Sequence, residues 1–373
     1  MKIAMIGQKG IPAKAGGVER HVEEIAKRLV KMQQSVTVYR RSTYEGESID
    51  NYEGINIREI KTIDNKNLDA IVYTYRATLD AIKNKFDIIH YHAIGPASLC
   101  FIPKLKGIKT LVTVHGLDWQ RGKWGRFGKT YLKLGEHVTG KRADKIITVS
   151  ENLKYYFLEK YKRKEEDIFF IPNGVNFTDP KSANIIRNLG IDGNQYILFL
   201  ARLVPEKGAH YLIEAYNKIH TDKKLVIAGG ASYTDCYVEE LKKLGQSNKN
   251  VIFTGNVSGD LLTELYSNCY FYVLPSDIEG MPLTVLEAMS FGKCCLVSDI
   301  PENTAVISSG EIGETFKHGD IEDLTRKLNF LLNNDELVSR KGEHSKGIIE
   351  NNYNWDLIAE STLDVYRQLT KVY

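Results

Sequence analysis

Residues 195–230 read QYILFLARLVPEKGAHYLIEAYNKIHTDKKLVIAGG. An apolar run over 195–202 is followed by apolar residues at helical spacing over 210–219, and then by a second apolar run over 224–230. This order predicts a strand, a helix and a second strand. Because apolar strands joined by helices are typical of parallel sheets covered on both faces, the stretch indicates an α/β fold.

The same alternation continues in both directions from this stretch. Strand and helix patterns reach back to KIAMIG at 2–7 and forward to a helical pattern at 323–332. Residues 171–182, IPNGVNFTDPKS, interrupt them with Pro, Asn, Gly and Asp, and so predict a joint. We therefore expect two facing, doubly wound, Rossmann-like domains with a deep cleft between them. The predicted parts are residues 1–176, residues 177–350 and a C-terminal helix at 351–373 that packs back on the first domain.

Length and composition are those of an ordinary globular protein. The chain has 373 residues, 43% hydrophobic and 26% charged, which excludes wholesale disorder, collagen-like repeats and coiled coil. No run of 18 apolar residues occurs, and the opening MKIAMIGQKG lacks the apolar region of a signal peptide, so we expect a cytoplasmic protein. Five cysteines without C-x-x-C spacing predict free, mostly buried thiols.

The net charge of +3 conceals an asymmetry between the two halves. Residues 1–170 contain 31 basic and 20 acidic side chains, whereas the remainder contains 19 basic and 27 acidic ones. The basic half therefore predicts contact with an anionic surface or ligand. A solvated basic face would have the same composition, so both interpretations stay open.

Gly16 and Gly17 stand between a predicted strand and a predicted helix. The N–H groups and the dipole of a helix N-terminus favour an anion, which makes this turn a candidate phosphate site. The intervals between Gly7, Gly10 and Gly16 do not match the dinucleotide-binding pattern, and no P-loop is present. A long turn without a ligand explains these glycines equally well.

Arg202 and Lys207 follow the predicted strand at 195–202. Ligands of open α/β sheets bind at this end of the strands, and a guanidinium together with an ammonium can clamp a diphosphate. Two solvated loop charges are the alternative.

A second charged pattern lies in residues 274–299, LPSDIEGMPLTVLEAMSFGKCCLVSD. Glu279 is predicted in the loop after a strand, and Glu287 in the first turns of the following helix. One carboxylate can meet a sugar or phosphate region while the other holds a diol such as ribose. Apolar neighbours surround Glu287, so its carboxylate needs a partner if it is buried.

Taken together, these residues resemble the retaining family-4 glycosyltransferases of the GT-B fold over essentially the whole chain. The resemblance depends on AGGVERHVEEIA at 15–26, VTVHG at 112–116, IPNGV at 171–175, ARLVPEKG at 201–208 and the E-G-x-P-x-x-x-x-E pattern at 279–287. The stretch VTVHGLDWQRGKWGRFGK is similar to the branch that contains bacterial rhamnosyltransferases of polysaccharide synthesis.

The resemblance implies a donor site for a nucleoside-diphosphate sugar. Arg202 and Lys207 would neutralise the leaving diphosphate, Glu287 would hold the ribose, and Glu279 would contact the sugar. Family members more often carry an aromatic residue or Phe-Gly after the Glu-Gly, where this chain has Met and Pro. The donor-binding residues implied are Gly16, Gly17, Arg202, Lys207, Gly280, Met281, Pro282, Leu283 and Glu287.

The implied reaction is departure of the nucleoside diphosphate as an acceptor hydroxyl attacks the anomeric carbon. His115 would lie near the transferred sugar, and with Glu279, Arg202 and Lys207 it completes the predicted catalytic set. Retention of configuration follows from the resemblance, and front-face attack is our hypothesis because no obvious nucleophile is present. No D-x-D occurs in the chain, so we expect neither a metal nor another cofactor.

Residues 101–146 contain 11 basic and 3 acidic side chains, with aromatic rings among them. Such a mixture suits an anionic membrane surface, and would place the protein on the inner face of the cell membrane with a lipid-diphosphate-linked saccharide as acceptor. Nucleic acid could use the same residues, but no nucleic-acid module accompanies them, and a solvated face is the third interpretation. The acceptor or membrane residues predicted are Trp119, Arg121, Lys123, Trp124 and Arg126.

A second function fits much of the same pattern. A GT-B enzyme that does not transfer its sugar, such as a sugar-nucleotide epimerase, would use similar diphosphate contacts. Only a transferase releases nucleoside diphosphate in an acceptor-dependent way. A pure scaffold is disfavoured because it has no need of Arg202, Lys207, Glu279 and Glu287 together.

Overall fold

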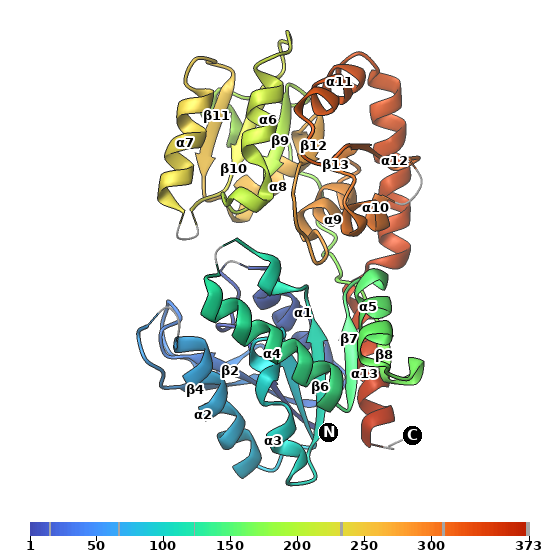
Figure 1. Ribbon diagram of the computed structural model, residues 1–373. Helices are drawn as coiled ribbons and strands as arrows, with labels where there is room; N and C mark the ends of the chain where they lie inside the picture. Colours follow the sequence, from blue (N-terminus) through green and yellow to red (C-terminus); the bar gives the residue numbers. More distant parts are fainter. Residues whose placement is uncertain (15, 66–67, 123, 232–233, 308–309, 371–373) are drawn as a thin grey trace. The chain divides into compact units, whose positions relative to one another are not determined.

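The computed structural model describes residues 1–14, 16–65, 68–122, 124–231, 234–307 and 310–370. The chain divides into two compact units, which are described separately below. Unit 1 comprises Met1–Gly174 and Trp355–Tyr373, and unit 2 comprises Val175–Asn354. Each unit is a sheet with helices on both faces, as Figure 1 shows, which confirms the predicted pair of Rossmann-like α/β domains. The units divide at 174/175 and 354/355, against predicted bounds at 176/177 and 350/351.

Unit 1 contains an eight-stranded sheet in which every neighbouring pair is parallel except β3 and β4. Strand β1 lies between β2 and β5, so the strand order reverses at the β1–β5 pair. The sheet order is β3 (Asn51–Tyr52), β4 (Ile55–Ile60), β2 (Ser35–Arg41), β1 (Lys2–Ile6), β5 (Ile88–His92), β6 (Lys109–Val114), β7 (Lys145–Thr148) and β8 (Ile168–Phe170).

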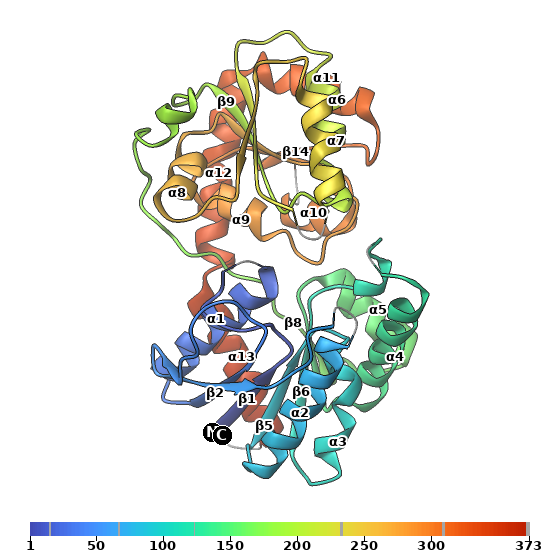
Figure 2. The same ribbon diagram turned by 90° about the vertical axis from the view of Figure 1, so that its left-hand side faces the viewer.

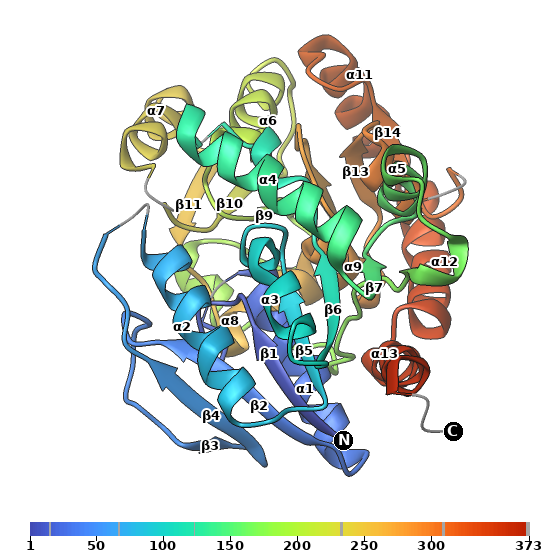
Figure 3. The same ribbon diagram turned by 60° about the horizontal axis from the view of Figure 1, so that its bottom comes forward.

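The helices of unit 1 cover both faces of this sheet. Figure 3 shows α2, α3 and α4 along one face, with α1 and α13 on the other. On that second face, Arg28 of α1 donates to Asp356 of α13 at 2.6 Å, so the last helix of the chain is part of unit 1. The helices are α1 (Gly17–Lys31), α2 (Asp69–Lys83), α3 (Phe101–Lys104), α4 (Arg126–Arg142), α5 (Glu151–Tyr161) and α13 (Trp355–Thr370).

Between β5 and β6 of unit 1, residues 96–104 form two short helical pieces. A 3₁₀ turn, η1 (Pro96–Leu99), precedes the single turn of α3. Pro103 has no N–H group to donate to Leu99, so the ladder of a continuous helix is interrupted there.

Unit 2 contains a six-stranded, all-parallel sheet. Its order is β11 (Val251–Gly255), β10 (Lys224–Ala228), β9 (Tyr196–Leu200), β12 (Phe271–Leu274), β13 (Cys295–Ser298) and β14 (Gly313–Phe316). The order reverses at the β9–β12 pair. Burial explains the composition of the central strands, since Ile197, Leu198 and Phe199 are fully buried between two layers of helices.

Figure 2 shows α6 and α7 on one face of this sheet, and α8 and α12 on the other. The helices of unit 2 are α6 (Ala209–Tyr216), α7 (Asp235–Gly245), α8 (Gly259–Asn268), α9 (Leu283–Ser290), α10 (Pro301–Ile307), α11 (Ile321–Leu332) and α12 (Asp335–Asn352). Over the described residues of both units, no helix combines the length and apolar character needed to cross a membrane.

Candidate functional site

The carboxyl ends of β9 and β12 bring Arg202, Lys207 and Glu279 into two adjacent loops of unit 2. Lys207 Nζ lies 2.5 Å from Glu279 Oε1, and the two side chains are only 16% and 7% exposed. The loops are also joined by their backbones, because Asp277 N–H donates to the Glu206 carbonyl at 2.9 Å. Lys207 is therefore held in a mostly buried ion pair, which argues against a solvated loop charge.

The ion pair with Glu279 does not use all the hydrogen-bond donors of the Lys207 ammonium group, so Lys207 can also bind an anion. An ammonium group carries three donors, so a Lys207 that donates to Glu279 retains donors for a phosphate. Arg202 lies in the same loop as Lys207 and is half-buried. The switch point of a doubly wound sheet is where such sheets bind their ligands, and this loop leaves β9 at that point.

Glu287 lies on α9 and has the partner that its apolar surroundings require. The Tyr266 hydroxyl donates to Glu287 Oε2 at 2.8 Å, and the Tyr266 ring stacks on Phe291 with 5.7 Å between ring centroids. Burial, and then the charge of Glu287, raise the pKa of Tyr266 well above its usual value, so the phenol stays a donor at neutral pH. A carboxylate has about four lone-pair positions, so the hydrogen bond from Tyr266 does not by itself exclude acceptance from a hydroxyl group.

The turn before α9 follows Glu279 directly in the sequence and precedes Glu287. Gly280 and Pro282 are buried, while Met281 and Leu283 are half-buried. Pro282 precedes the first turn of α9, and its own side chain has no atom that could accept from the first N–H groups of the helix. The first N–H groups of the helix are consequently suited to an external acceptor.

Two further titratable residues of unit 2, Asp277 and Glu302, were not singled out from the sequence. Asp277, two residues before Glu279, lies 2.7 Å from His318 Nε2. Burial, and then the charge of Glu279, raise the pKa of Glu302. Their partners come from segments far apart in the sequence, so no local spacing pointed to either residue.

In unit 1, Gly16 and Gly17 form the predicted turn before α1, but carboxylates already interact with that turn. Gly16 has φ of +103°, and a Cβ there would lie 2.2 Å from Glu19 Oε2, so only glycine fits. Glu19 accepts from Lys9 N–H at 3.1 Å, and Glu23 accepts from Ala13 N–H at 2.5 Å. Acidic side chains of α1 therefore hold the loop at the place where we predicted a phosphate.

His115 directly follows β6 and belongs to a cluster of imidazoles that sequence reasoning missed. Its Nε2 lies 3.3 Å from Nδ1 of His92, the last residue of β5, and its ring centroid is 4.7 Å from that of His21 on α1. Burial lowers the pKa of all three rings, to about 4 for His21, so they are neutral at pH 7. The H-Y-H pattern at the end of β5 was the available signal, because alternate strand residues share a face.

Trp119, predicted to face an acceptor or membrane, is held by a buried carboxylate. Its Nε1 donates to Glu136 on α4 at 2.6 Å, and Lys133 Nζ lies 4.9 Å from the ring centroid. Glu136 also accepts from three side chains of α5. These are Tyr156, Lys160 and Tyr161, at 2.9, 2.6 and 2.5 Å.

The other predicted acceptor residues differ in exposure. Arg121 is half-buried and pairs with Asp118 at 3.3 Å, and the Trp124 side chain lies against Gly128. Arg126 is exposed at the start of α4, next to Phe127, which is 68% exposed. Lys123 lies outside the described residues.

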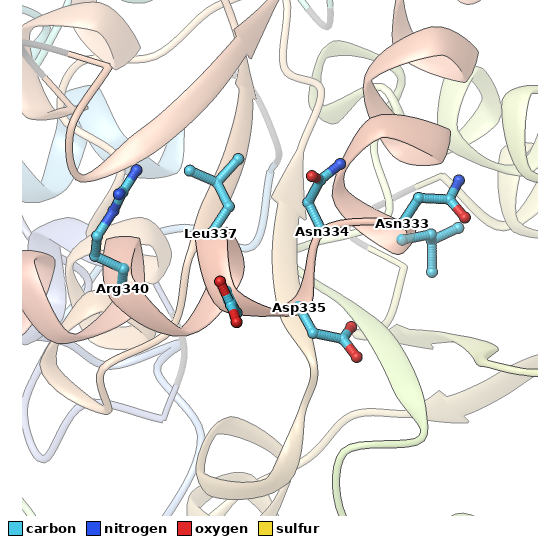
Figure 4. A pocket seen from close by; sticks show the side chains of 7 residues that line it. Asn333, Asn334, Asp335, Leu337 and Arg340 are labelled. Atoms are coloured by element: carbon cyan, nitrogen blue, oxygen red, sulfur yellow. The ribbon is translucent and has the colours of Figure 1, made fainter.

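A surface depression of unit 2 lies elsewhere in the fold, where α11 ends and α12 begins (Figure 4). Its lining includes no residue of the predicted site. The lining residues are Leu332, Asn333, Asn334, Asp335, Glu336, Leu337 and Arg340.

Two family models match the chain in succession. Residues 15–179 match "Glycosyltransferase Family 4", and residues 181–355 match "Glycosyl transferases group 1". Together they span nearly all of both units.

Curated relatives and a solved structure agree with these matches. The chain is 27% identical to an uncharacterized glycosyltransferase of Methanocaldococcus jannaschii, over 98% of each chain. It is 26% identical to the capsular polysaccharide biosynthesis glycosyltransferase CapM of Staphylococcus aureus, over 70% of each chain. Anabaena HepE, solved with UDP and glucose, has a TM-score of 0.83 at 18% identity, over 99% of this chain and 100% of that one. These likenesses support the predicted GT-B class of fold.

Proposed function

We propose that the chain transfers a sugar from a nucleoside diphosphate to a saccharide acceptor with retention of configuration, because glycosyltransferase family models match residues 15–179 and 181–355 in succession. The observation that supports this most strongly is the Lys207–Glu279 ion pair at the strand-order reversal of unit 2, in which Lys207 belongs to the loop that also carries Arg202. A buried ammonium at the end of a parallel strand is suited to an anionic leaving group.

In the proposed donor site, Arg202 and Lys207 bind the diphosphate and Glu287 accepts from the ribose hydroxyls. Glu279 has two roles, since it orients Lys207 and offers a carboxylate oxygen to the sugar. UDP is the first nucleotide to test, because HepE was solved with UDP and glucose. The resemblance to rhamnosyltransferases makes rhamnose a sugar to test alongside glucose.

In the proposed reaction, Arg202 and Lys207 stabilise the charge that develops on the leaving group. As the glycosidic bond breaks, negative charge collects on the departing diphosphate, and preoriented cations stabilise it without reorganising. His115 would meet a sugar hydroxyl as a neutral ring, because burial holds the pKa of its imidazole well below the usual value. We propose that transfer needs no divalent metal.

For the acceptor we propose a saccharide of a surface polysaccharide, carried on a lipid diphosphate. The capsular polysaccharide relative supports the polysaccharide, and the basic, partly apolar start of α4 supports membrane contact. Exposed Arg126 and Phe127 can insert among anionic headgroups, whereas Trp119 is held by Glu136 and would position the neighbouring loop.

A two-stage experiment tests the function. A thermal-shift screen of UDP, dTDP and GDP sugars finds the donor, since a ligand raises the unfolding midpoint according to its concentration relative to its Kd. Release of nucleoside diphosphate is then measured with EDTA present, with and without a lipid-linked saccharide acceptor. We expect acceptor-dependent release. Isomerisation of the donor sugar without such release would show the epimerase instead.

A further inference from the structure

Three imidazoles from separate segments of unit 1 meet where its sheet order reverses. His21 comes from the first turns of α1, His92 ends β5, and His115 follows β6. One donor nitrogen of each ring lies within 4.8 Å of the other two. Among the described residues, His21, His92 and His115 are the three side chains of the metal-binding types (histidine, cysteine or carboxylate) that lie close enough together to hold a metal ion.

The nitrogen spacings are near those of a zinc site. Zinc binds imidazole nitrogen at about 2.0–2.1 Å in a tetrahedron, which puts two ligand nitrogens about 3.4 Å apart. Nδ1 of His92 and Nε2 of His115 are 3.3 Å apart, so this pair already has the required separation. The three ligand nitrogens lie within 4.8 Å of one another, so any pair that is still too far apart has to close by at most about 1.4 Å to complete a three-imidazole face.

The contact between His92 Nδ1 and His115 Nε2 is a hydrogen bond, so one of these two nitrogens carries a proton that a metal ion would displace. His21 Nδ1 lies 2.9 Å from the amide oxygen of Asn173, which can only accept, so Nδ1 carries the proton and Nε2 is unprotonated. Metal-binding histidines use their second nitrogen in this way. When His92 binds a metal through Nδ1, its proton has to lie on Nε2, which is buried and has no hydrogen-bond partner in the part of the chain that the structure describes, and this weakens the site.

His90 packs against His92 with 4.1 Å between ring centroids, but both of its nitrogens are engaged. Nδ1 lies 2.7 Å from the Tyr366 hydroxyl, and Nε2 lies 2.7 Å from the Thr113 hydroxyl. His90 therefore fixes the position of His92 and is not a fourth ligand.

Arg121 is close enough to His115 to act on it electrostatically, and its charge would repel a cation. We therefore expect weaker binding than at a structural zinc site.

We propose that His21, His92 and His115 bind one divalent transition-metal ion, with zinc as the best match to three imidazole ligands. Binding itself does not depend on the proposed function. One consequence does rest on it: a metal bound to His115 would compete with the sugar, so zinc should inhibit transfer and EDTA should reverse the inhibition.

Equilibrium dialysis of the full chain, free of any histidine tag, tests the proposal. After treatment with a chelator, the protein is dialysed against ZnCl2, and bound zinc is measured by mass spectrometry. We expect about one zinc per chain. His21→Ala and His92→Ala should each weaken binding at least about tenfold, while exposed His220→Ala should bind like the wild type.

A second measurement does not depend on whether the variants fold. CoCl2 added to the wild type should produce the visible absorption of tetrahedral cobalt, and ZnCl2 should remove it. Wild type that binds no zinc, or that gives only the spectrum of aqueous cobalt, overturns the proposal and leaves a hydrogen-bonded histidine cluster. Unchanged zinc binding in both folded variants would place the ion elsewhere and equally reject it. Neither readout uses sugar transfer, so failure of the proposed function is a separate result.

Discussion

The two units place different chemistry at equivalent positions of similar sheets. In unit 2, the β9–β12 reversal carries Lys207 and Glu279 in a mostly buried ion pair. In unit 1, the β1–β5 reversal carries neutral imidazoles, and the nearby helix N-terminus already has carboxylates against it. The comparison teaches that equivalent positions of two similar sheets carry side chains of different chemical character, charged in unit 2 and neutral in unit 1. Unit 2 is suited to an anion, and unit 1 to hydroxyl groups or a metal.

The neutrality of the imidazole cluster can be tested through stability, where we expect the largest effect. Burial lowers the pKa of His21 from 6.5 to about 4, so between these values the unfolded chain binds a proton that the folded chain does not. Stability contributed by the neutral ring is therefore complete above pH 6.5 and falls as the pH drops to 4, by about 3 kcal/mol for this residue.

Urea unfolding at several pH values from 7 to 4 measures this effect. Between pH 7 and pH 4, the free energy of unfolding of His21→Gln should fall by about 3 kcal/mol less than that of the wild type. That of His220→Gln should fall as much as that of the wild type. If both variants lose stability as steeply as the wild type, His21 is not held neutral and the contrast between the units fails.

The next effect concerns Glu136, a carboxylate of unit 1 that is almost fully buried. Glu136→Gln should lower the free energy of unfolding by about 2 kcal/mol, because charged acceptors bind buried donors more strongly than an amide does. Burial alone would raise the pKa of Glu136, but hydrogen bonds from Lys160 and three other side chains hold it below the usual value. Its contribution is thus present at neutral pH and is lost as the pH falls through that lowered pKa.

Denaturation curves at pH 7 and pH 4 check the Glu136 prediction, with exposed Glu159→Gln as the matched control on α5. The difference from the wild type should shrink at the lower pH. A variant as stable as the wild type at pH 7 would mean that Trp119 and α5 do not depend on this carboxylate.

The proposed contact between Lys207 of unit 2 and the leaving diphosphate can be tested by measuring turnover. Lys207→Ala should reduce kcat at least about tenfold, equivalent to about 1.4 kcal/mol, because one charge contact to the leaving diphosphate is removed. The matched control is Lys218→Ala, a lysine of the same unit in an exposed pair with Glu322. Near-normal turnover of the Lys207 variant would reject the phosphate contact.

The smallest effect is expected at the exposed start of α4. Phe127→Ser should weaken binding to anionic vesicles by about 1 kcal/mol, since one partly inserted ring is lost. Flotation with vesicles at moderate salt measures this, and exposed Tyr155→Ser of α5 is the control. Wild type that fails to float with anionic vesicles would reject membrane contact and leave a solvated basic face.

Much of unit 2's site was accessible from the sequence because its residues lie in short loops after recognisable strands. Arg202, Lys207 and Glu279 could be assigned to strand ends without any knowledge of the sheet order. Contacts across the fold could not be read in that way. Tyr266, the partner of Glu287, lies 21 positions away, and Glu136 was counted only as an acidic residue in a basic segment.

The sequence by itself determined the alternation of strands and helices, because apolar periodicity reports burial locally. It also determined which loops carry charge. Only the tertiary structure decided which strands are neighbours, and hence that Lys207 pairs with Glu279 and that three histidines meet. It also decided that Glu19 interacts with the turn predicted for phosphate. The physical reason is that pairing depends on distance in space, and parallel strands become neighbours only after the intervening helices have packed.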